Sequence, residues 1–261
     1  MPVSENDLSR ARSLPELLSR SGPVALFLDF DGVLADIAPT PDSVRVDSAT
    51  ISRLQSLNSA LGGALAIVSG RDLAALDALL APLSLAMAGD HGNARRRGDG
   101  STVTLNESAM IAAAALGSDL DELFGDDPRI IVEHKPSAVA VHYRLAPERA
   151  EDCIAAVGAA AGMSDELSLV AGKMVVEARA AGASKGAALR GFMEEPPFAG
   201  RTPIFVGDDV TDEDGFAAAQ QIGGVGIKVG AGDTVARYRI GGTRDVAPVL
   251  DAIIRSKGWV N

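Results

Sequence analysis

The chain has 261 residues, 47% of them apolar, and its 24 basic and 35 acidic residues give a formal net charge of −11. This excess of negative charge argues against binding to nucleic acid or to an anionic membrane surface. No apolar stretch approaches the roughly 20 residues that cross a bilayer, and the N-terminal segment does not read as a secretion signal. The single cysteine, Cys153, excludes an internal disulfide and is expected to pack in a core. These features predict an ordinary soluble globular protein, which we expect to be cytoplasmic, and they leave protein partners open.

Short apolar runs bounded by turn residues predict buried strands. They lie at residues 24–28, 64–68, 85–88, 204–206 and 225–229. Leucines and isoleucines at helical spacing lie between residues 51 and 61, after the first run, and between residues 73 and 80, after the second. Strands that alternate with helices are typical of a parallel sheet covered on both faces, so we expect an α/β fold with a doubly wound core.

The middle of the chain has a different pattern. It reads as helix, strand, strand, helix, strand, strand, at residues 109–116, 129–133, 138–144, 147–161, 168–170 and 173–179, with Gly172 as a turn. This order predicts a smaller α+β unit over residues 106–182. It would be inserted between the two parts of the core, 1–105 and 183–261.

Carboxylates gather where two of the predicted strands end. Asp29 and Asp31 follow the first strand, and Asp208, Asp209 and Asp212 follow the fourth. In an open α/β sheet the binding crevice lies beyond the carboxyl ends of the strands, so we expect both clusters at one edge. Acids this close suppress each other's ionisation unless a cation neutralises them, and Mg²⁺ prefers oxygen ligands. A strand-end turn with a helix cap would explain the first pair alone, but it does not explain both clusters.

Four residues are candidates for phosphoryl chemistry. An aspartate can attack phosphorus to form an aspartyl-phosphate, and Asp29 is the candidate nucleophile. Asp31 lies two residues further on, where it can reach the leaving oxygen as general acid and then act as general base. Ser69, after the second strand, can bind phosphate oxygens, although an ordinary helix cap is the alternative. Lys185 opens a helix and can neutralise the phosphate, although a plain surface lysine is the alternative.

In chain order, these acids, Ser69 and Lys185 resemble the motifs of the haloacid dehalogenase (HAD) superfamily of phosphohydrolases. Further segments narrow the resemblance to the trehalose-6-phosphate phosphatases: residues 28–34, 68–71, 89–92, 132–135, 141–144, 172–177 and 206–213. The resemblance implies an HAD-like core with an inserted cap, and Mg²⁺-dependent hydrolysis of trehalose 6-phosphate to trehalose and phosphate, a step of trehalose biosynthesis. Two positions depart from the family pattern: Ala180 stands where Pro is frequent, and Ser184 where Asp or Asn is more usual.

The resemblance also implies a role for each matching residue. The expected catalytic residues are Asp29, Asp31, Ser69 and Lys185. The expected metal site comprises Asp29, the main-chain carbonyl of Asp31, and Asp208, with Asp209 and Asp212 orienting its surroundings and Lys185. The expected sugar contacts are Glu133, Lys135 and Glu177, with Arg71, His91, His142 and Arg144 as weaker candidates. Hinges near Asn106 and Gly182 would let the cap close over the substrate.

Two alternatives stay open at this point. The first is another capped sugar phosphatase, for example one that acts on sucrose phosphate or on a mannosyl-phosphoglycerate. The second is a phospho-accepting signalling protein, because receiver domains also use an aspartate, an acidic metal pocket and a lysine. Such domains are about half as long as this chain and lack a cap, which makes this second alternative the weaker one.

Overall fold

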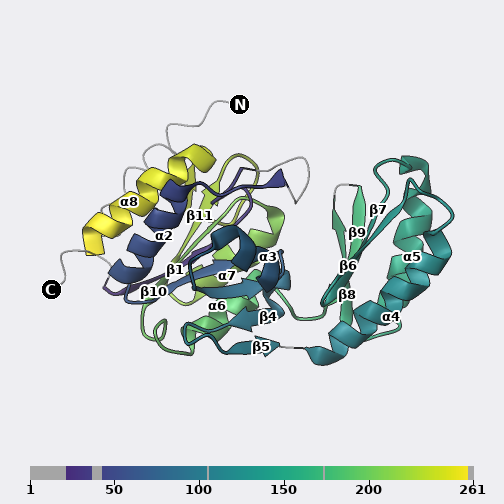
Figure 1. Cartoon of the computed structure of the whole chain (residues 1–261), viewed down its shortest axis with the longest axis horizontal. Helices are drawn as coiled ribbons and strands as arrows, with labels where there is room; N and C mark the ends of the chain where they lie inside the picture. Colours follow the sequence, from purple (N-terminus) through teal and green to yellow (C-terminus); the bar gives the residue numbers. More distant parts are fainter. Residues whose placement is uncertain (1–21, 37–42, 105, 173, 258–261) are drawn as a thin grey trace. The chain divides into compact units, whose positions relative to one another are not determined.

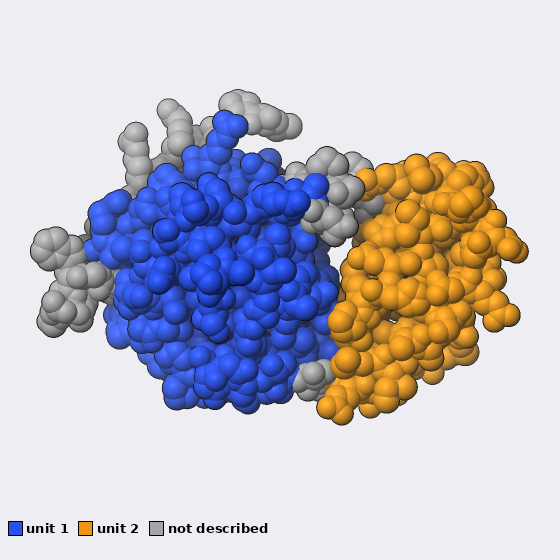
Figure 2. All heavy atoms as spheres, in the orientation of Figure 1, with its two compact units in different colours: residues 1–103, 184–261 blue, residues 104–183 orange. Residues whose placement is uncertain are grey.

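The structure is a computed structural model that describes residues 22–36, 43–104, 106–172 and 174–257. The chain divides into two compact units, which Figures 1 and 2 show. Unit 1 comprises residues 1–103 and 184–261, and unit 2 comprises residues 104–183. The polar N-terminal leader and Lys173, which belongs to one of the matching segments, lie outside the described residues.

Within the described residues, unit 1 is built on an eight-stranded sheet with the order β12-β11-β10-β1-β2-β3-β4-β5. The strands from β12 to β3 pair in parallel, and β4 runs antiparallel to β3. The strands are β1 Val24–Leu28, β2 Leu65–Val68, β3 Ala86–Gly89, β4 Ala94–Arg96, β5 Thr102–Thr104, β10 Thr202–Gly207, β11 Val225–Val229 and β12 Tyr238–Ile240. Every residue of the central strand β1 is buried, as expected of an apolar run in a sheet covered on both faces. The predicted α/β class is confirmed.

Two pairs of helices cover this sheet: α2 packs against α8, and α6 packs against α7 (Figure 1). The helices of unit 1 are α2 Ser48–Ala60, α3 Leu73–Leu80, α6 Lys185–Met193, α7 Glu213–Gln221 and α8 Val246–Lys257, with 3₁₀ turns η2 Asp90–Gly92, η4 Val210–Asp212 and η5 Thr243–Asp245. From β1 the chain continues to β2 and β3 on one side of the sheet, whereas from β10 it continues to β11 and β12 on the other side. Right-handed crossovers therefore place α2 and α7 on opposite faces of the sheet. Phe27 of β1 packs beneath α6, where its ring lies 6.1 Å from that of Phe192.

The sequence pattern missed the short elements at the margins of the sheet. Strands β4, β5 and β12 each have three residues, and both β4 and β12 carry arginine. Such segments lack the continuous apolar run that marks a buried parallel strand. Helix α8 was also missed, although Val246, Leu250 and Ile253 form a buried stripe at helical spacing along it.

Unit 2 contains a four-stranded antiparallel sheet with the order β6-β7-β9-β8. Its elements are α4 Glu107–Phe124, β6 Ile131–Lys135, β7 Ala138–His142, η3 Pro147–Arg149, α5 Ala150–Gly162, β8 Leu167–Gly172 and β9 Val175–Ala180. Helix α4 is longer than the predicted Ala-rich stretch, because Leu116, Leu120 and Phe124 continue its buried stripe. Cys153 lies in the apolar core of this unit, as predicted.

None of the helices that the structure describes is both long enough and apolar enough to cross a membrane.

Candidate active site

Consecutive strand ends bring polar residues to one edge of the sheet in unit 1. Strand β1 pairs in register with β10 and β2, and β2 pairs with β3. The residues that directly follow these strands are Asp29 after β1, Ser69 after β2, Asp90 after β3 and Asp208 after β10. Parallel strands end at a common edge, so these four loops lie together there.

Lys185 lies at the centre of this edge as the first residue of α6. Its ammonium group lies 2.7 Å from Asp29 Oδ2 and 2.7 Å from Asp212 Oδ1. The side chain of Lys185 is only 3% exposed, and those of the two acids are 6% and 0% exposed. Ser184 caps the helix by accepting a hydrogen bond from Ala187 N, which fixes the backbone from which the lysine projects. The surface-lysine alternative is therefore wrong.

Asp212 organises the loop that follows β10. Its Oδ2 accepts hydrogen bonds of 2.9 Å from the main-chain N–H groups of Asp208 and Asp209, while its Oδ1 accepts from Lys185. A side chain at Gly207 would overlap the Asp212 carboxyl, so this glycine is what lets the carboxyl fold back onto its own loop. Asp212 thus ties the second acidic cluster to the lysine.

Gly32 allows the two acidic loops to approach each other. Its backbone has a φ of +70°, which favours glycine, and a Cβ at this position would overlap the carboxyl of Asp208. One carboxylate oxygen from each of Asp29, Asp208 and Asp212 lies within 4.8 Å of the others. This set of oxygen donors suits a hard divalent cation such as Mg²⁺.

Burial and the neighbouring acids raise the pKa values of Asp29 and Asp208. Burial raises the pKa of Asp29 well above its usual value; the charge of Asp212 adds to this, and Lys185 opposes it. Burial, followed by the charges of Asp212 and Asp209, raises the pKa of Asp208 to about 6. Burial alone would lower the pKa of Lys185, but Asp29 and Asp212 outweigh that effect and raise it. A divalent cation among the oxygens would offset the negative charge of these acids, so the residues fit the group.

The carboxylates of Asp31 and Asp209 have partners outside this cluster. Arg71 holds Asp31 in a two-pronged ion pair, with Nε 2.7 Å from Oδ2 and the second guanidinium nitrogen 2.8 Å from Oδ1. The guanidinium also lies 5.4 Å above the ring of Phe30. The exposed Asp209 accepts a hydrogen bond from Val210 N. Arg71, which we expected to contact the sugar, therefore contacts Asp31, the candidate general acid.

Ser69 is buried and does not cap a helix. The cap of α3 is Asp72, whose carboxylate accepts from Ala75 N at 2.7 Å, so the helix-cap alternative for Ser69 is wrong. The Ser69 hydroxyl instead accepts a 3.2 Å hydrogen bond from Arg71 N within the same loop.

His91 packs against the loop that carries Ser69. A Cβ built on Gly70 would lie 2.6 Å from the His91 ring, so only glycine leaves room for the imidazole. Asp90, His91 and Gly92 all have positive φ values, of 50°, 53° and 105°. This tight turn fixes the ring beside the Ser69 loop.

Known proteins resemble this chain over most of its length. A family model described as trehalose-phosphatase matches residues 27–244. The trehalose-6-phosphate phosphatase of Escherichia coli (strain K12) is 41% identical over 239 residues, which cover 92% of this chain and 88% of that protein. The chain belongs to the trehalose-phosphatase family.

Solved structures agree on the fold. The C-terminal domain of the Candida albicans trehalose-6-phosphate phosphatase matches with a TM-score of 0.81 at 22% identity, over 97% of this chain and 98% of that one. A Bacteroides thetaiotaomicron phosphatase of the HAD superfamily matches with a TM-score of 0.58 at 18% identity, over 89% and 94% of the two chains. The fold is therefore HAD-like, as predicted.

Unit 2 holds the other residues that the family resemblance singled out. Glu133 and Glu177 both lie opposite Ala140 in the register of the sheet, so their side chains emerge on one face with that of Lys135. Lys135 Nζ lies 3.2 Å from Glu177 Oε1, and His142 Nε2 lies 2.8 Å from Glu133 Oε2. The His142 hydrogen bond lowers the pKa of Glu133. His142 therefore lies beside Glu133, one of the expected sugar contacts. Arg144 lies beyond the end of β7 and is exposed.

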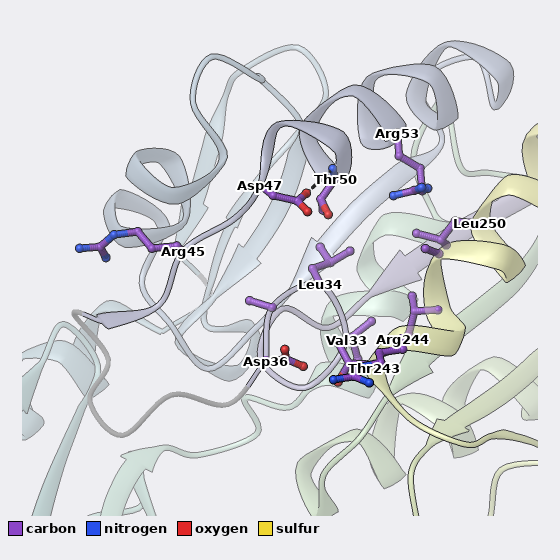
Figure 3. Close-up of a pocket in the computed structure, with 13 residues that line it drawn as sticks. Val33, Leu34, Asp36, Arg45, Asp47, Thr50, Arg53, Thr243, Arg244 and Leu250 are labelled. Carbon is purple, nitrogen blue, oxygen red and sulfur yellow. Dashed lines mark hydrogen bonds between the residues drawn. The ribbon is translucent and has the colours of Figure 1, made fainter.

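A cavity of about 220 Å³ lies next to residues 33–36, the segment that follows the acidic loop in the sequence (Figure 3). Residues 33–36 form one wall, and the first turns of α2 and α8 contribute the others. The Thr243 hydroxyl, on this wall, donates a 3.2 Å hydrogen bond to the carbonyl of Gly32. Sequence reasoning missed this anchor, because nothing local signals a contact between residues 211 positions apart.

Proposed function

We propose that this chain hydrolyses trehalose 6-phosphate to trehalose and phosphate. The observation that carries the proposal is the buried bridge from Asp29 through Lys185 to Asp212, in a member of the trehalose-phosphatase family. A fully buried lysine between two acids is costly for a domain to maintain without a use for it. In phosphoryl transfer such a group both orients the nucleophile and binds the charge of the phosphoryl oxygens.

Asp29 is the proposed nucleophile. A carboxylate oxygen attacks phosphorus, the bond from phosphorus to the sugar oxygen breaks, and the phosphoryl group stays on Asp29 as an acyl phosphate. Asp29 Oδ1 accepts the Phe30 N–H at 2.7 Å and Oδ2 accepts from Lys185, so both oxygens are held before substrate arrives. Ser69 is proposed to bind the transferring group from the neighbouring loop.

Asp31 is the proposed acid and base. It gives its proton to the departing sugar oxygen, becomes a carboxylate, and later accepts a proton from the water that attacks the acyl phosphate. The two-pronged contact with Arg71 fixes the position of the Asp31 carboxyl group. We propose that Arg71 holds this carboxylate between the two steps, rather than contacting the sugar.

Mg²⁺ is the proposed cofactor. Asp29, Asp208 and the main-chain carbonyl of Asp31 would hold it, with Asp212 and Asp209 shaping the loop around them. When bound, Mg²⁺ supplies positive charge to the oxygens of the phosphate. Few protein ligands would suffice, because Mg²⁺ also takes oxygen ligands from water and from phosphate groups.

Unit 2 is proposed to be the cap that selects the sugar. Glu133, Lys135 and Glu177 are charged, share one face of its sheet, and offer both donors and acceptors for sugar hydroxyls. The cap would close by hinge motion near Asn106 and Gly182, which shields the acyl phosphate from side reactions. We also propose a cytoplasmic location, because a charged sugar phosphate does not diffuse through a bilayer.

A panel of sugar phosphates tests the proposal. We expect phosphate release from trehalose 6-phosphate with a kcat/KM at least tenfold above that for glucose 6-phosphate, sucrose 6-phosphate and mannosyl-3-phosphoglycerate. Asp29→Asn, which keeps the shape of the side chain, is the control and should show no turnover. A preference for another phosphosugar would overturn the substrate, and activity in the Asn variant would overturn the mechanism.

A further inference from the structure

Lys228 is a buried lysine in the interior of strand β11. It is 4% exposed, and the rest of the strand consists of valine, glycine and isoleucine. Burying an ammonium group is unfavourable unless it is paired and hydrogen-bonded, so a lysine at such a position needs a partner.

The partner is the loop that carries the second acidic cluster. Lys228 lies opposite Gly207, the last residue of β10, in the register of the two parallel strands. From there its ammonium group donates a hydrogen bond to the main-chain carbonyl oxygen of Asp208. The lysine thus reaches across one strand end to the residue that follows β10.

The main chain around Asp208 is consequently held at both of its polar groups. Asp212 Oδ2 accepts from the N–H of Asp208, and Lys228 donates to the carbonyl of the same residue. A residue whose N–H and C=O are both fixed has little freedom to rotate. The carboxylate that this backbone carries supplies one of the three oxygens, with those of Asp29 and Asp212, that lie within 4.8 Å of one another.

The charge of Lys228 also matters for the cluster. The carboxylates of Asp29, Asp208, Asp209 and Asp212 lie on the two acidic loops, and Lys185 and Lys228 are buried lysines that contact these loops.

We propose that Lys228 is a positioning residue for metal binding: it fixes the peptide of Asp208 so that the carboxylate is preorganised for Mg²⁺. This inference rests on the proposed function, because it concerns the cation of that site. It also predicts the direction in which the loss of Lys228 changes the affinity for Mg²⁺. The positive charge of Lys228 repels Mg²⁺, whereas its hydrogen bond preorganises a ligand, and the proposal requires preorganisation to outweigh repulsion.

Lys228→Met tests this, because methionine keeps the length and apolar volume of the side chain and removes the donor and the charge. Mg²⁺ titrated into the protein without substrate, followed by calorimetry, should bind about 10- to 100-fold more weakly than to the wild type, as is typical when a group that orients a metal ligand is lost. Lys228→Arg keeps a charged donor and should recover part of the affinity.

Arg95→Met is the matched control. Arg95 is also a buried cation of unit 1, 5% exposed, and its ion pair with Glu195 lies beyond the far end of α6 from Lys185. This variant should lower the melting temperature while leaving the Mg²⁺ affinity unchanged. If Lys228→Met does not fold, Lys228→Arg carries the test, with an expected smaller loss of affinity.

The outcomes separate this inference from the proposed function. Equal or tighter Mg²⁺ binding by Lys228→Met, or by Lys228→Arg where only that variant folds, overturns the positioning role and leaves the phosphatase proposal standing. A loss of affinity of equal size in Arg95→Met also overturns it, because the effect would then be one of general stability. A wild-type protein that binds no Mg²⁺ overturns the metal role of the proposed function itself.

Discussion

Two lysine–carboxylate contacts, one in each unit, differ in their burial and in their length. In unit 1, Lys185 lies 2.7 Å from both Asp29 and Asp212, and its side chain is 3% exposed. In unit 2, Lys135 lies 3.2 Å from Glu177, and its side chain is 23% exposed. The buried contact is part of a fixed network, which suits bond-breaking chemistry. The more exposed contact is easily exchanged for hydroxyl groups of a ligand, which suits sugar recognition.

The largest effect is expected from Lys185→Met. This change leaves Asp29 and Asp212 buried without their counter-charge, which should destabilise the protein by about 3–5 kcal/mol and abolish turnover. Thermal unfolding and phosphate release measure the two effects. The matched change in unit 2, Lys135→Met, should cost at most about 1 kcal/mol of stability, because that contact is partly open to solvent. Equal losses of stability in the two variants would remove the distinction between the contacts.

Lys135→Met should instead change substrate use. We expect KM for trehalose 6-phosphate to rise about tenfold, the free-energy equivalent of one hydrogen bond to a charged group, with little change in hydrolysis of phenyl phosphate, which has no sugar. Glu177→Gln, which removes the negative charge of the other member of the pair, should act in the same direction. A fall in kcat for both substrates would mean that unit 2 contributes to chemistry.

The acids of unit 1 should make metal binding depend on pH. Asp208 has a pKa of about 6 in the folded protein against an ordinary value of 3.8. In that interval the folded protein holds a proton that the unfolded chain has lost, so the metal-free protein should gain stability as the pH falls through about 6. Mg²⁺ competes with the same proton, so its affinity should fall over the same range. Calorimetry between pH 5 and pH 8 measures this, and Asp208→Asn, with no such proton, should lose the part of the pH dependence of the metal-free stability that Asp208 contributes.

The smallest effect is expected from Thr243→Val. Loss of the hydroxyl removes the 3.2 Å hydrogen bond to Gly32, which should lower stability by about 1 kcal/mol and kcat severalfold. Thr243→Ser retains the hydroxyl and should behave as the wild type. Indistinguishable valine and serine variants would show that the loop after Asp31 does not need this anchor.

Much of the core and the site was predictable from the sequence, because its strongest signals are local. Strands β1 and β11 coincide with predicted apolar runs, since a buried parallel strand is apolar on both faces. The short strands β4 and β12, at the margins of the sheet, carry charged residues and lack a continuous apolar run. The acids were found because each cluster directly follows such a run.

Contacts between distant segments were not predictable in the same way. The pairing of Arg71 with Asp31 joins residues 40 positions apart, and their spacing carries no sign of it. Lys228 was passed over because a single charge in a predicted strand usually marks an exposed position. Only the register with β10 reveals that its ammonium group meets the Asp208 carbonyl.

The central claim is that unit 1 carries out the chemistry and unit 2 selects the sugar. Its most direct test is the ratio of kcat/KM for trehalose 6-phosphate to that for phenyl phosphate, in the wild type and in a variant that combines Glu133→Gln, Lys135→Met and Glu177→Gln. We expect this ratio to fall about 100-fold or more in the variant, while phenyl phosphate is hydrolysed at the wild-type rate. A proportional loss of both activities, with the ratio unchanged, would contradict the claim.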